Sequence, residues 1–380
     1  MPAAPHRSEI VAGAHTVVAK VGTRVLTAPD GSLDVARIES LAGQLAALAD
    51  AGRRVALVSS GAVGAGVGRL KLPGRPSGLA QLQAVAAVGQ SRLIEAYNGA
   101  LQSRGRHAAQ VLLTADDLND RARYLNVRNT LTALFEYGAI PVINENDTVR
   151  VDELQRTVGD NDRLAAVVAN LLRAPLLVLL SDVEGLYDRA PDDPDARLLP
   201  TVDNVETVRS LAVASPAGVM SRGGMASKLE AARLVTAAGE NAIIANGRRE
   251  NVLVDLLAGK PIGTLFVAQG GSVSSRKRWL GSTAQPSGRL TLDAGACRAV
   301  TERGSSLLAV GISAVDGGFD KGDLVALCDG AGSEVARGLA NYSADEIRRI
   351  AGHGKDEIAQ ILGHCPYDSV VHRDHLALVR

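Results

Sequence analysis

The sequence contains few aromatic residues and no excess of charge of either sign. Aromatic side chains make up 3% of the 380 residues. Lysine and arginine together number 41, as do aspartate and glutamate, so the formal net charge is zero. A chain without net charge has no overall field that attracts nucleic acid, so each local basic cluster must be judged by itself.

Cysteine and long apolar runs are also scarce. Cys297, Cys328 and Cys365 lie far apart and form no C-x-x-C pair, which excludes a disulfide framework and a cysteine zinc site. The start of the chain lacks the apolar core of a signal peptide, and no run reaches the roughly 18 residues that a membrane helix needs. We therefore expect a soluble, cytoplasmic protein that does not associate with membranes.

Several well-known catalytic signatures are missing. Neither the phosphate-binding loop G-x-x-x-x-G-K-[ST] nor the acyl-transfer elbow G-x-S-x-G occurs. The glycines at 64, 66 and 68 do not have the spacing of a dinucleotide-binding fingerprint. The histidines near the carboxyl terminus lack zinc-ligand spacing apart from the weak pattern H-R-D-H, so we predict no protein metal site.

The residues that are present favour an α/β fold. Hydrophobic residues make up 46% of the chain, and glycine occurs 40 times. Short apolar runs alternate with helical patterns, such as those over 34–51, 79–102 and 117–136, and the connections are short. This alternation predicts a doubly wound, mostly parallel sheet. The expected strands lie at 16–19, 55–58, 111–113, 140–143, 175–180, 243–245 and 263–266.

The character of the chain changes near residue 270. Glycine and serine are followed by Arg276-Lys277-Arg278-Trp279 and a turn-rich segment, and then by short strands and one short helix over 343–351. We predict an amino-terminal tail over 1–14, the α/β domain over 15–269, a linker over 270–286 and a small β-rich domain over 287–375.

Two polar clusters lie in the middle of the α/β domain. The expected strand at 140–143 is followed directly by Asn144-Glu145-Asn146-Asp147, and Gly159-Asp160-Asn161-Asp162 precedes a helical pattern. Turns and helix caps explain one such residue, but not two dense clusters. Ligands of open α/β sheets bind at the carboxyl ends of the strands, so we interpret these clusters as a binding site.

Other expected strand ends carry groups that suit anions. Lys20 ends the first strand, and Ser60-Gly61 opens a glycine-rich turn that feeds a helix. Taken alone, the lysine is more often structural, and the glycine turn could serve only for close packing. Together with the acids, amides and a second lysine, Lys228, the set suits phosphoryl transfer.

The motifs, in their order, resemble those of the glutamate 5-kinases of the amino-acid kinase family. The resemblance covers about residues 15–375, including a carboxyl-terminal part similar to a PUA domain. Single motifs are shared with other amino-acid kinases, whereas the combination of INEND, VGDND and a carboxyl-terminal PUA-like part is specific to the glutamate 5-kinases. Ser181 stands where the family frequently has threonine and keeps the hydroxyl. The matching motifs are VVAKVGTRVL, VSSGAVGAG, AAVGQSRL, INENDTV, VGDND, SDVEGLY, GGMASK and RRIAGH.

This resemblance implies that ATP, with Mg²⁺, phosphorylates the γ-carboxylate of L-glutamate in the first step of proline biosynthesis. By matching positions, it assigns catalysis to Lys20, Lys228 and Asp162. The implied glutamate-binding residues are Ser60, Gly61, Asp147, Asp160 and Asn161, and the implied nucleotide-binding residues are Lys20, Ser181, Asp182, Gly223, Gly224, Met225 and Lys228. It further implies a homo-oligomer, dimer or tetramer, and feedback inhibition by proline.

Two alternatives stay open at this point. The chain could be chiefly an RNA-binding protein, because PUA-like modules occur in RNA-modifying enzymes and Arg276–Trp279 places charge beside an aromatic ring. Against this, the carboxyl-terminal part has no dense basic stripe. The second alternative is a kinase for another acidic substrate, such as aspartate or N-acetylglutamate.

Overall fold

The computed structural model of the chain describes residues 7–28, 31–149, 161–191, 193–212, 224–269 and 285–379. The chain divides into two compact units, Met1–Gly271 and Ser272–Arg380. The basic cluster Arg276–Trp279 and most of the expected linker lie outside the described residues.

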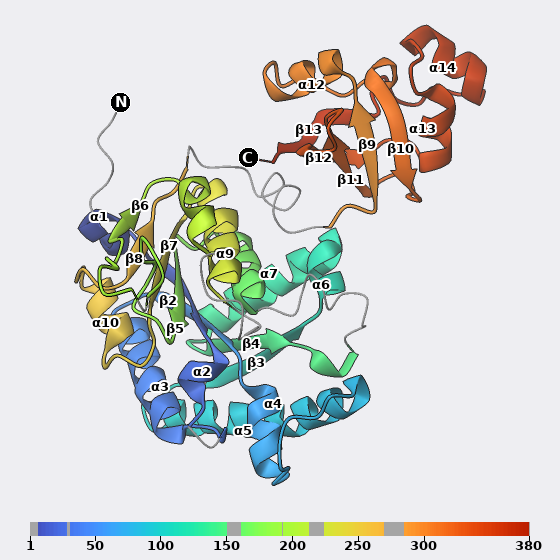
Figure 1. The fold of residues 1–380 in the computed structure, drawn as a ribbon. Coiled ribbons are helices and arrows are strands. Elements are labelled where there is room, and N and C mark those ends of the chain that lie inside the picture. Colours follow the sequence, from blue (N-terminus) through green and yellow to red (C-terminus); the bar gives the residue numbers. More distant parts are fainter. Residues whose placement is uncertain are drawn as a thin grey trace. The chain divides into compact units, whose positions relative to one another are not determined.

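The first unit is built on an eight-stranded sheet (Figure 1). All of its pairings are parallel except that of β7 with β8, so the expectation of a mostly parallel sheet is confirmed. In spatial order the strands are β3 (Ala108–Leu113), β4 (Ile140–Glu145), β2 (Arg54–Ser59), β1 (Thr16–Val21), β5 (Leu176–Ser181), β7 (Asn241–Asn246), β8 (Thr264–Phe266) and β6 (Thr201–Val202).

Helices cover both faces of this sheet. One face packs against α3, α5 and α10, and the other against α7, α8 and α9. Among the described residues, no helix has both the length and the apolar character needed to cross a membrane. The helices are α1 (Arg7–Ala12), α2 (Thr23–Leu26), α3 (Val35–Asp50), α4 (Ala62–Arg69), α5 (Leu79–Gln102), α6 (Ala115–Asn119), α7 (Arg121–Glu136), α8 (Asn161–Leu172), α9 (Met225–Ala237) and α10 (Val252–Leu257), with 3₁₀ turns η1 (Asp147–Val149) and η3 (Val205–Ala212).

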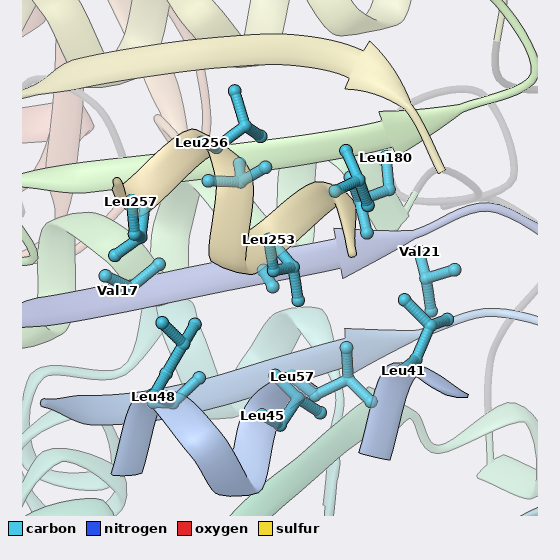
Figure 2. Close-up of a cluster of buried hydrophobic side chains, with 14 of the residues drawn as sticks. Val17, Val21, Leu41, Leu45, Leu48, Leu57, Leu180, Leu253, Leu256 and Leu257 are labelled. Carbon is cyan, nitrogen blue, oxygen red and sulfur yellow. The ribbon is translucent and has the colours of Figure 1, made fainter. Parts of the chain in front are cut away.

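The apolar core fixes which way β1 faces. Val17 and Val21 pack with Leu45 of α3 and Leu253 of α10 in one buried cluster (Figure 2). Each fully buried leucine or valine contributes about 1.5–3 kcal/mol, so a slip of one residue in register would be costly. Because successive strand residues alternate in direction, Lys20 faces the opposite side of the sheet, where α8 lies.

The helix expected over 117–136 is in fact two helices, α6 and α7. Thr114 and Asp117 form a capping box at the start of α6. Asp120 ends α6 and caps α7, because its side chain accepts a hydrogen bond from the Arg123 backbone N–H at 2.7 Å. Aspartate occurs both as a helix cap and on the exposed face of a helix. The sequence alone therefore did not show that Asp120 separates two helices.

The second unit is a five-stranded mixed sheet with short helices. Strands β9 and β11 are parallel, and the other neighbouring pairs are antiparallel. The β-rich character is as predicted, but α12, α14 and β13 were not predicted; β13 reads VHRDHLAL, whose polar residues conceal a strand pattern. The elements are β9 (Gly288–Leu292), α12 (Ala294–Thr301), η5 (Ala309–Gly311), β10 (Ile312–Gly317), β11 (Leu324–Cys328), β12 (Glu334–Ala340), α13 (Ala344–Ile350), α14 (Lys355–Leu362) and β13 (Val371–Leu378).

Candidate active site

Polar side chains from far-apart segments meet at the carboxyl edge of the first sheet. The parallel strands β1, β2, β4 and β5 all end there, and α8 begins there, as strand ends and helix starts do in open α/β sheets. The groups brought to this edge are Lys20 of β1, Ser60 after β2, Asn144 of β4, Ser181 of β5, and Asn161 and Asp162 at the start of α8.

A buried carboxylate links two lysines at this edge. Asp162 has no exposed surface, and its Oδ1 lies 2.6 Å from the Nζ of Lys20. Its Oδ2 lies 3.3 Å from the Nζ of Lys228, on the second turn of α9, and accepts a 2.7 Å hydrogen bond from the Ser227 hydroxyl. The predicted catalytic residues are therefore in direct contact, and Ser227 joins them.

The charge state of Asp162 follows from its neighbours. Burial acts to raise the pKa of this carboxyl, but the ammonium groups of Lys20 and Lys228 lower it, and hydrogen bonds from Lys20 and Ser227 add to their effect. The attraction prevails, so the pKa lies below its ordinary value of 3.8. Asp162 is therefore ionised at neutral pH and lies against the Nζ atoms of both lysines.

A second polar cluster is centred on Asn161. Its Nδ2 donates to the Ser60 hydroxyl at 2.9 Å, to Asn144 Oδ1 at 3.1 Å and to the Ser59 carbonyl at 3.3 Å. One side chain thus joins the ends of β2 and β4 to the start of α8. Because Asn161 directly precedes Asp162, the two polar clusters share a single helix start.

The turn after Ser60 requires a glycine. Gly61 adopts a φ of +106°, a left-handed conformation that residues with a Cβ rarely tolerate, and α4 begins at the next residue. This sharp turn keeps the Ser60 hydroxyl at the sheet edge. The glycine-rich segment after β2 is therefore a structural necessity as well as a candidate binding loop.

Ser181 and Asp182 lie beside an arginine that sequence reasoning did not identify. The Ser181 hydroxyl donates to Asp182 Oδ1 at 3.0 Å, and Arg24 of α2 contacts Asp182 Oδ2 at 2.9 Å. Partial burial acts to raise the pKa of Asp182, but the hydrogen bond from Arg24, with those from the backbone and Ser181, lowers it overall. This pair fixes the end of β5 relative to α2.

The remaining expected residues are placed as follows. Gly224 is the N-cap of α9, with no side chain of its own to cap the helix, and Met225 is the first helical residue. Asp147 begins the 3₁₀ turn η1 directly after β4 and is half-buried. Asp160 and Gly223 lie outside the described residues.

Besides Arg24, three side chains at this edge were not predicted as site residues. Ser227 stands inside the G-G-M-A-S-K motif beside Lys228, so its neighbour in sequence could have indicated it. Asn144 was recognised as part of a polar cluster but not as a site residue. Gln90 belongs to the AAVGQSRL motif, and its Oε1 accepts a 2.8 Å hydrogen bond from Asn144 Nδ2.

Within the described ranges, no group of three or more histidine, cysteine, aspartate or glutamate side chains is placed to hold a metal ion. Asp162 directs one oxygen to Lys20 and the other to Lys228 and Ser227. These residues suit an anionic ligand better than a cation held by protein groups alone.

Two family models match the chain. The model of the amino acid kinase family matches residues 15–246, and that of the PUA domain matches residues 288–362. Among solved structures, the chain is similar to carbamate kinase from Giardia lamblia bound to AMP-PNP, with 21% identity, a TM-score of 0.49, and 67% of this chain and 98% of that chain covered.

Curated relatives extend over nearly the whole chain. Glutamate 5-kinase of Rhodopirellula baltica is 50% identical over 372 residues, or 98% of this chain and 96% of the relative. Glutamate 5-kinase of Pseudomonas fluorescens Pf-5 is 46% identical over 97% of this chain and 99% of the relative. That of Geobacter sulfurreducens is 44% identical over 98% and 100%. The chain belongs to the amino acid kinase family and, within it, to the glutamate 5-kinases.

Proposed function

We propose that this protein transfers the γ-phosphoryl group of ATP to the γ-carboxylate of L-glutamate, which gives L-glutamyl 5-phosphate and ADP. This is the first step of proline biosynthesis, and a cytoplasmic location is part of the proposal. The observation that carries it is the pair of adjoining clusters at the start of α8, Lys20–Asp162–Lys228 and Ser60–Asn161–Asn144.

The lysines act on charge rather than as proton carriers. A γ-carboxylate is ionised at pH 7, so attack on the phosphoryl group needs no general base. The barrier lies in bringing one anion to another, and two preorganised ammonium groups lower it most where negative charge spreads over the transferring phosphoryl group. Asp162 orients Lys20 and Lys228 through its two carboxylate oxygens.

Glutamate binds at the second cluster in this proposal. Ser60, Gly61 and Asn161 contact the amino acid, with Asp160 nearby. Asp147 pairs with the α-ammonium group, because a half-buried carboxylate directly after β4 is its natural partner.

The nucleotide binds beside α9. Gly224 and Met225 at the amino end of this 13-residue helix face the phosphates with Lys20 and Lys228, and Ser181 and Asp182 line the nucleotide. Gly223 is assigned to the same role from the sequence motif alone. Mg²⁺ bound to ATP would neutralise part of the phosphate charge. Because the described residues form no metal cluster, we assign it no protein ligand.

A coupled ADP-release assay tests the proposal directly. The purified protein is offered ATP and, in separate reactions, L-glutamate, L-aspartate and N-acetyl-L-glutamate. We expect the highest kcat/KM with L-glutamate. A preference for either other acid would overturn the substrate assignment, and no ADP release with any of them would overturn the kinase assignment.

We extend the proposal to assembly and regulation on the basis of family membership. The protein forms a homo-oligomer, a dimer or a tetramer, and proline inhibits it. Light scattering gives the mass in solution, and glutamate titrations at several proline concentrations test the inhibition. A monomeric mass, or rates unaffected by proline, would contradict the respective part.

A further inference from the structure

We propose that Gln90 is a positioning residue of the amino-acid subsite. Three side-chain amides, those of Gln90, Asn144 and Asn161, form a relay that fixes which hydrogen-bonding atoms the site presents to its substrate. That the substrate is an amino acid rests on the proposed function. The relay itself follows from hydrogen bonds whose direction is set by the backbone.

The Asn144 and Asn161 amides are each oriented by a hydrogen bond to a backbone group. The backbone N–H of Glu145 donates to Asn144 Oδ1 at 2.9 Å, and an N–H group can act only as a donor. The carbonyl of Ser59 accepts from Asn161 Nδ2 at 3.3 Å, and a carbonyl can act only as an acceptor. The oxygen and nitrogen positions of both asparagine amides are therefore determined.

The orientations of the Asn144 and Asn161 amides determine which atom of the Gln90 amide is the oxygen. Asn144 Oδ1 accepts from Glu145 N and from Asn161 Nδ2, so Asn144 Nδ2 must find an acceptor on its other side. Gln90 Oε1 is that acceptor, at 2.8 Å. Gln90 is only 8% exposed, and within the described residues its Nε2 makes no hydrogen bond, so holding Asn144 is the interaction that its amide makes.

At the end of the relay opposite Gln90, the Ser60 hydroxyl is a hydrogen-bond donor and Asn161 Oδ1 is an acceptor. Because the Ser60 oxygen accepts from Asn161 Nδ2 at 2.9 Å, its own proton is directed elsewhere and can be donated to a ligand. Asn161 Oδ1 receives no hydrogen bond within the described part of the chain and stays an acceptor. A hydroxyl donor beside an amide acceptor matches the carboxylate and ammonium groups of a free α-amino acid.

Close helix packing places Gln90 where it can act. A Cβ at Gly89 would lie 1.8 Å from the Ala62 carbonyl oxygen, and one at Gly66 would lie 1.9 Å from that of Val85. The backbones of α4 and α5 therefore touch at these glycines, and the next residue of α5 is Gln90. Since α4 begins directly after Gly61, the contact between α4 and α5 places Gln90 close to the Ser60 turn.

The relay predicts a selective defect in Gln90→Met, which keeps the length of the side chain but lacks the amide oxygen. The buried Asn144 amide loses its acceptor, so the orientation of Asn161 is no longer enforced. In the full-length enzyme we expect KM for L-glutamate to rise about tenfold, the loss typical of one hydrogen bond, with KM for ATP unchanged within about twofold. We also expect weaker discrimination against glutarate, which lacks the ammonium group.

Gln44→Met is the matched control. Gln44 is also a buried glutamine, 4% exposed, whose Oε1 accepts from a backbone N–H, that of Leu253, at 2.8 Å. It lies in α3, where its hydrogen bonds go to α10 and to Ser40 and not to the Asn144–Asn161 cluster, so we expect its loss to affect stability alone. Gln90→Glu keeps an acceptor in either protonation state, and we expect it to restore most of the glutamate affinity.

The outcomes separate the relay from the proposed function. Failure of the wild-type protein to use glutamate overturns the function, whereas an active wild type and an unchanged glutamate KM in Gln90→Met overturn the relay. Equal KM changes in Gln90→Met and Gln44→Met also overturn it. If Gln90→Met does not fold, Asn144→Ala decides in its place: a rise in KM for glutamate but not for ATP supports the relay, and no such rise overturns it.

Discussion

Lys20 and Asp162 form a buried ion pair, with 2.6 Å between Nζ and Oδ1, that ties the first strand of the sheet to the start of α8. The preceding residue, Asn161, donates a hydrogen bond from its Nδ2 to the Ser60 Oγ at 2.9 Å. Two consecutive residues of one helix thus hold the lysine that we propose acts on phosphate and the hydroxyl that we propose acts on the amino acid. Their adjacency fixes the distance between the two halves of the site.

Replacing either lysine should impair the chemical step. We expect Lys20→Met and Lys228→Met each to lower kcat by roughly 10²-fold or more, because each removes positive charge that, in the proposed mechanism, stabilises the transition state. Both side chains are about 5% exposed, so their charge acts in a poorly screened environment. Steady-state kinetics, with circular dichroism to confirm folding, provide the measurement.

Lys260→Met is the control for this pair. Lys260 is 57% exposed and pairs with Asp255 on the surface, where an ion pair contributes little. We expect its kcat to equal that of the wild type. Near-normal kcat in a folded Lys20→Met or Lys228→Met protein would show that the assigned role is wrong.

Asp162 should make stability depend on pH in the acid range. Its folded-state pKa is depressed below 3.8, so its contribution is complete above that pH and is lost as pH falls through the folded value. We expect Asp162→Asn to be about 3–5 kcal/mol less stable at pH 7, because the buried lysines lose their counter-charge. Urea unfolding from pH 7 to 3 should show this difference shrinking below about pH 4. A difference that stays constant would contradict the argument.

Asp147→Asn should affect one substrate selectively. Loss of a charge-assisted bond to the α-ammonium group costs roughly 2–4 kcal/mol, so KM for glutamate should rise far more than KM for ATP. Initial rates with one substrate varied at a time give both constants. An equal rise in KM for glutamate and in KM for ATP would identify Asp147 as a residue of the η1 turn with a purely structural role.

Sequence patterns predicted the parts of the site that lie at element ends. Lys20, Ser60 and Asp162 stand where strands stop or helices begin, and parallel strands must bring such residues to one edge. Gln90 lies in the interior of α5, where helical periodicity says which face is buried but not which helix it meets. Its position depends on the contact between Gly66 and Gly89, which only tertiary structure reveals.

The division into two units predicts the behaviour of a truncated protein. The residues assigned to the site lie between Lys20 and Lys228, within the unit Met1–Gly271. A chain ending at Gln269 keeps β8 paired with β7 and should fold and phosphorylate glutamate. Ending the chain before β8 should leave the sheet edge exposed and cause aggregation. Specific activity and light scattering test both; a folded but inactive chain ending at Gln269 would show that the second unit helps to form the site.

The contact between α4 and α5 can be tested with two glycines of one helix. In Gly89→Ala, the new Cβ would fall 1.8 Å from the Ala62 carbonyl oxygen and 2.4 Å from the Gly66 nitrogen, so α5 must move away from α4. We expect a loss of about 1–3 kcal/mol in unfolding free energy, the usual cost of overpacking, together with a higher KM for glutamate as Gln90 shifts.

Gly99→Ala is the matched control, because nothing lies within 4 Å of the Cβ it would add in the same helix. Alanine favours helix over glycine, so this variant should be about 0.5–1 kcal/mol more stable, with KM unchanged. Chemical denaturation and glutamate titrations of the two variants give the comparison. A Gly89→Ala protein with wild-type stability and KM would mean that the two helices do not need their close approach, and that the Ser60 turn is positioned by β2 alone.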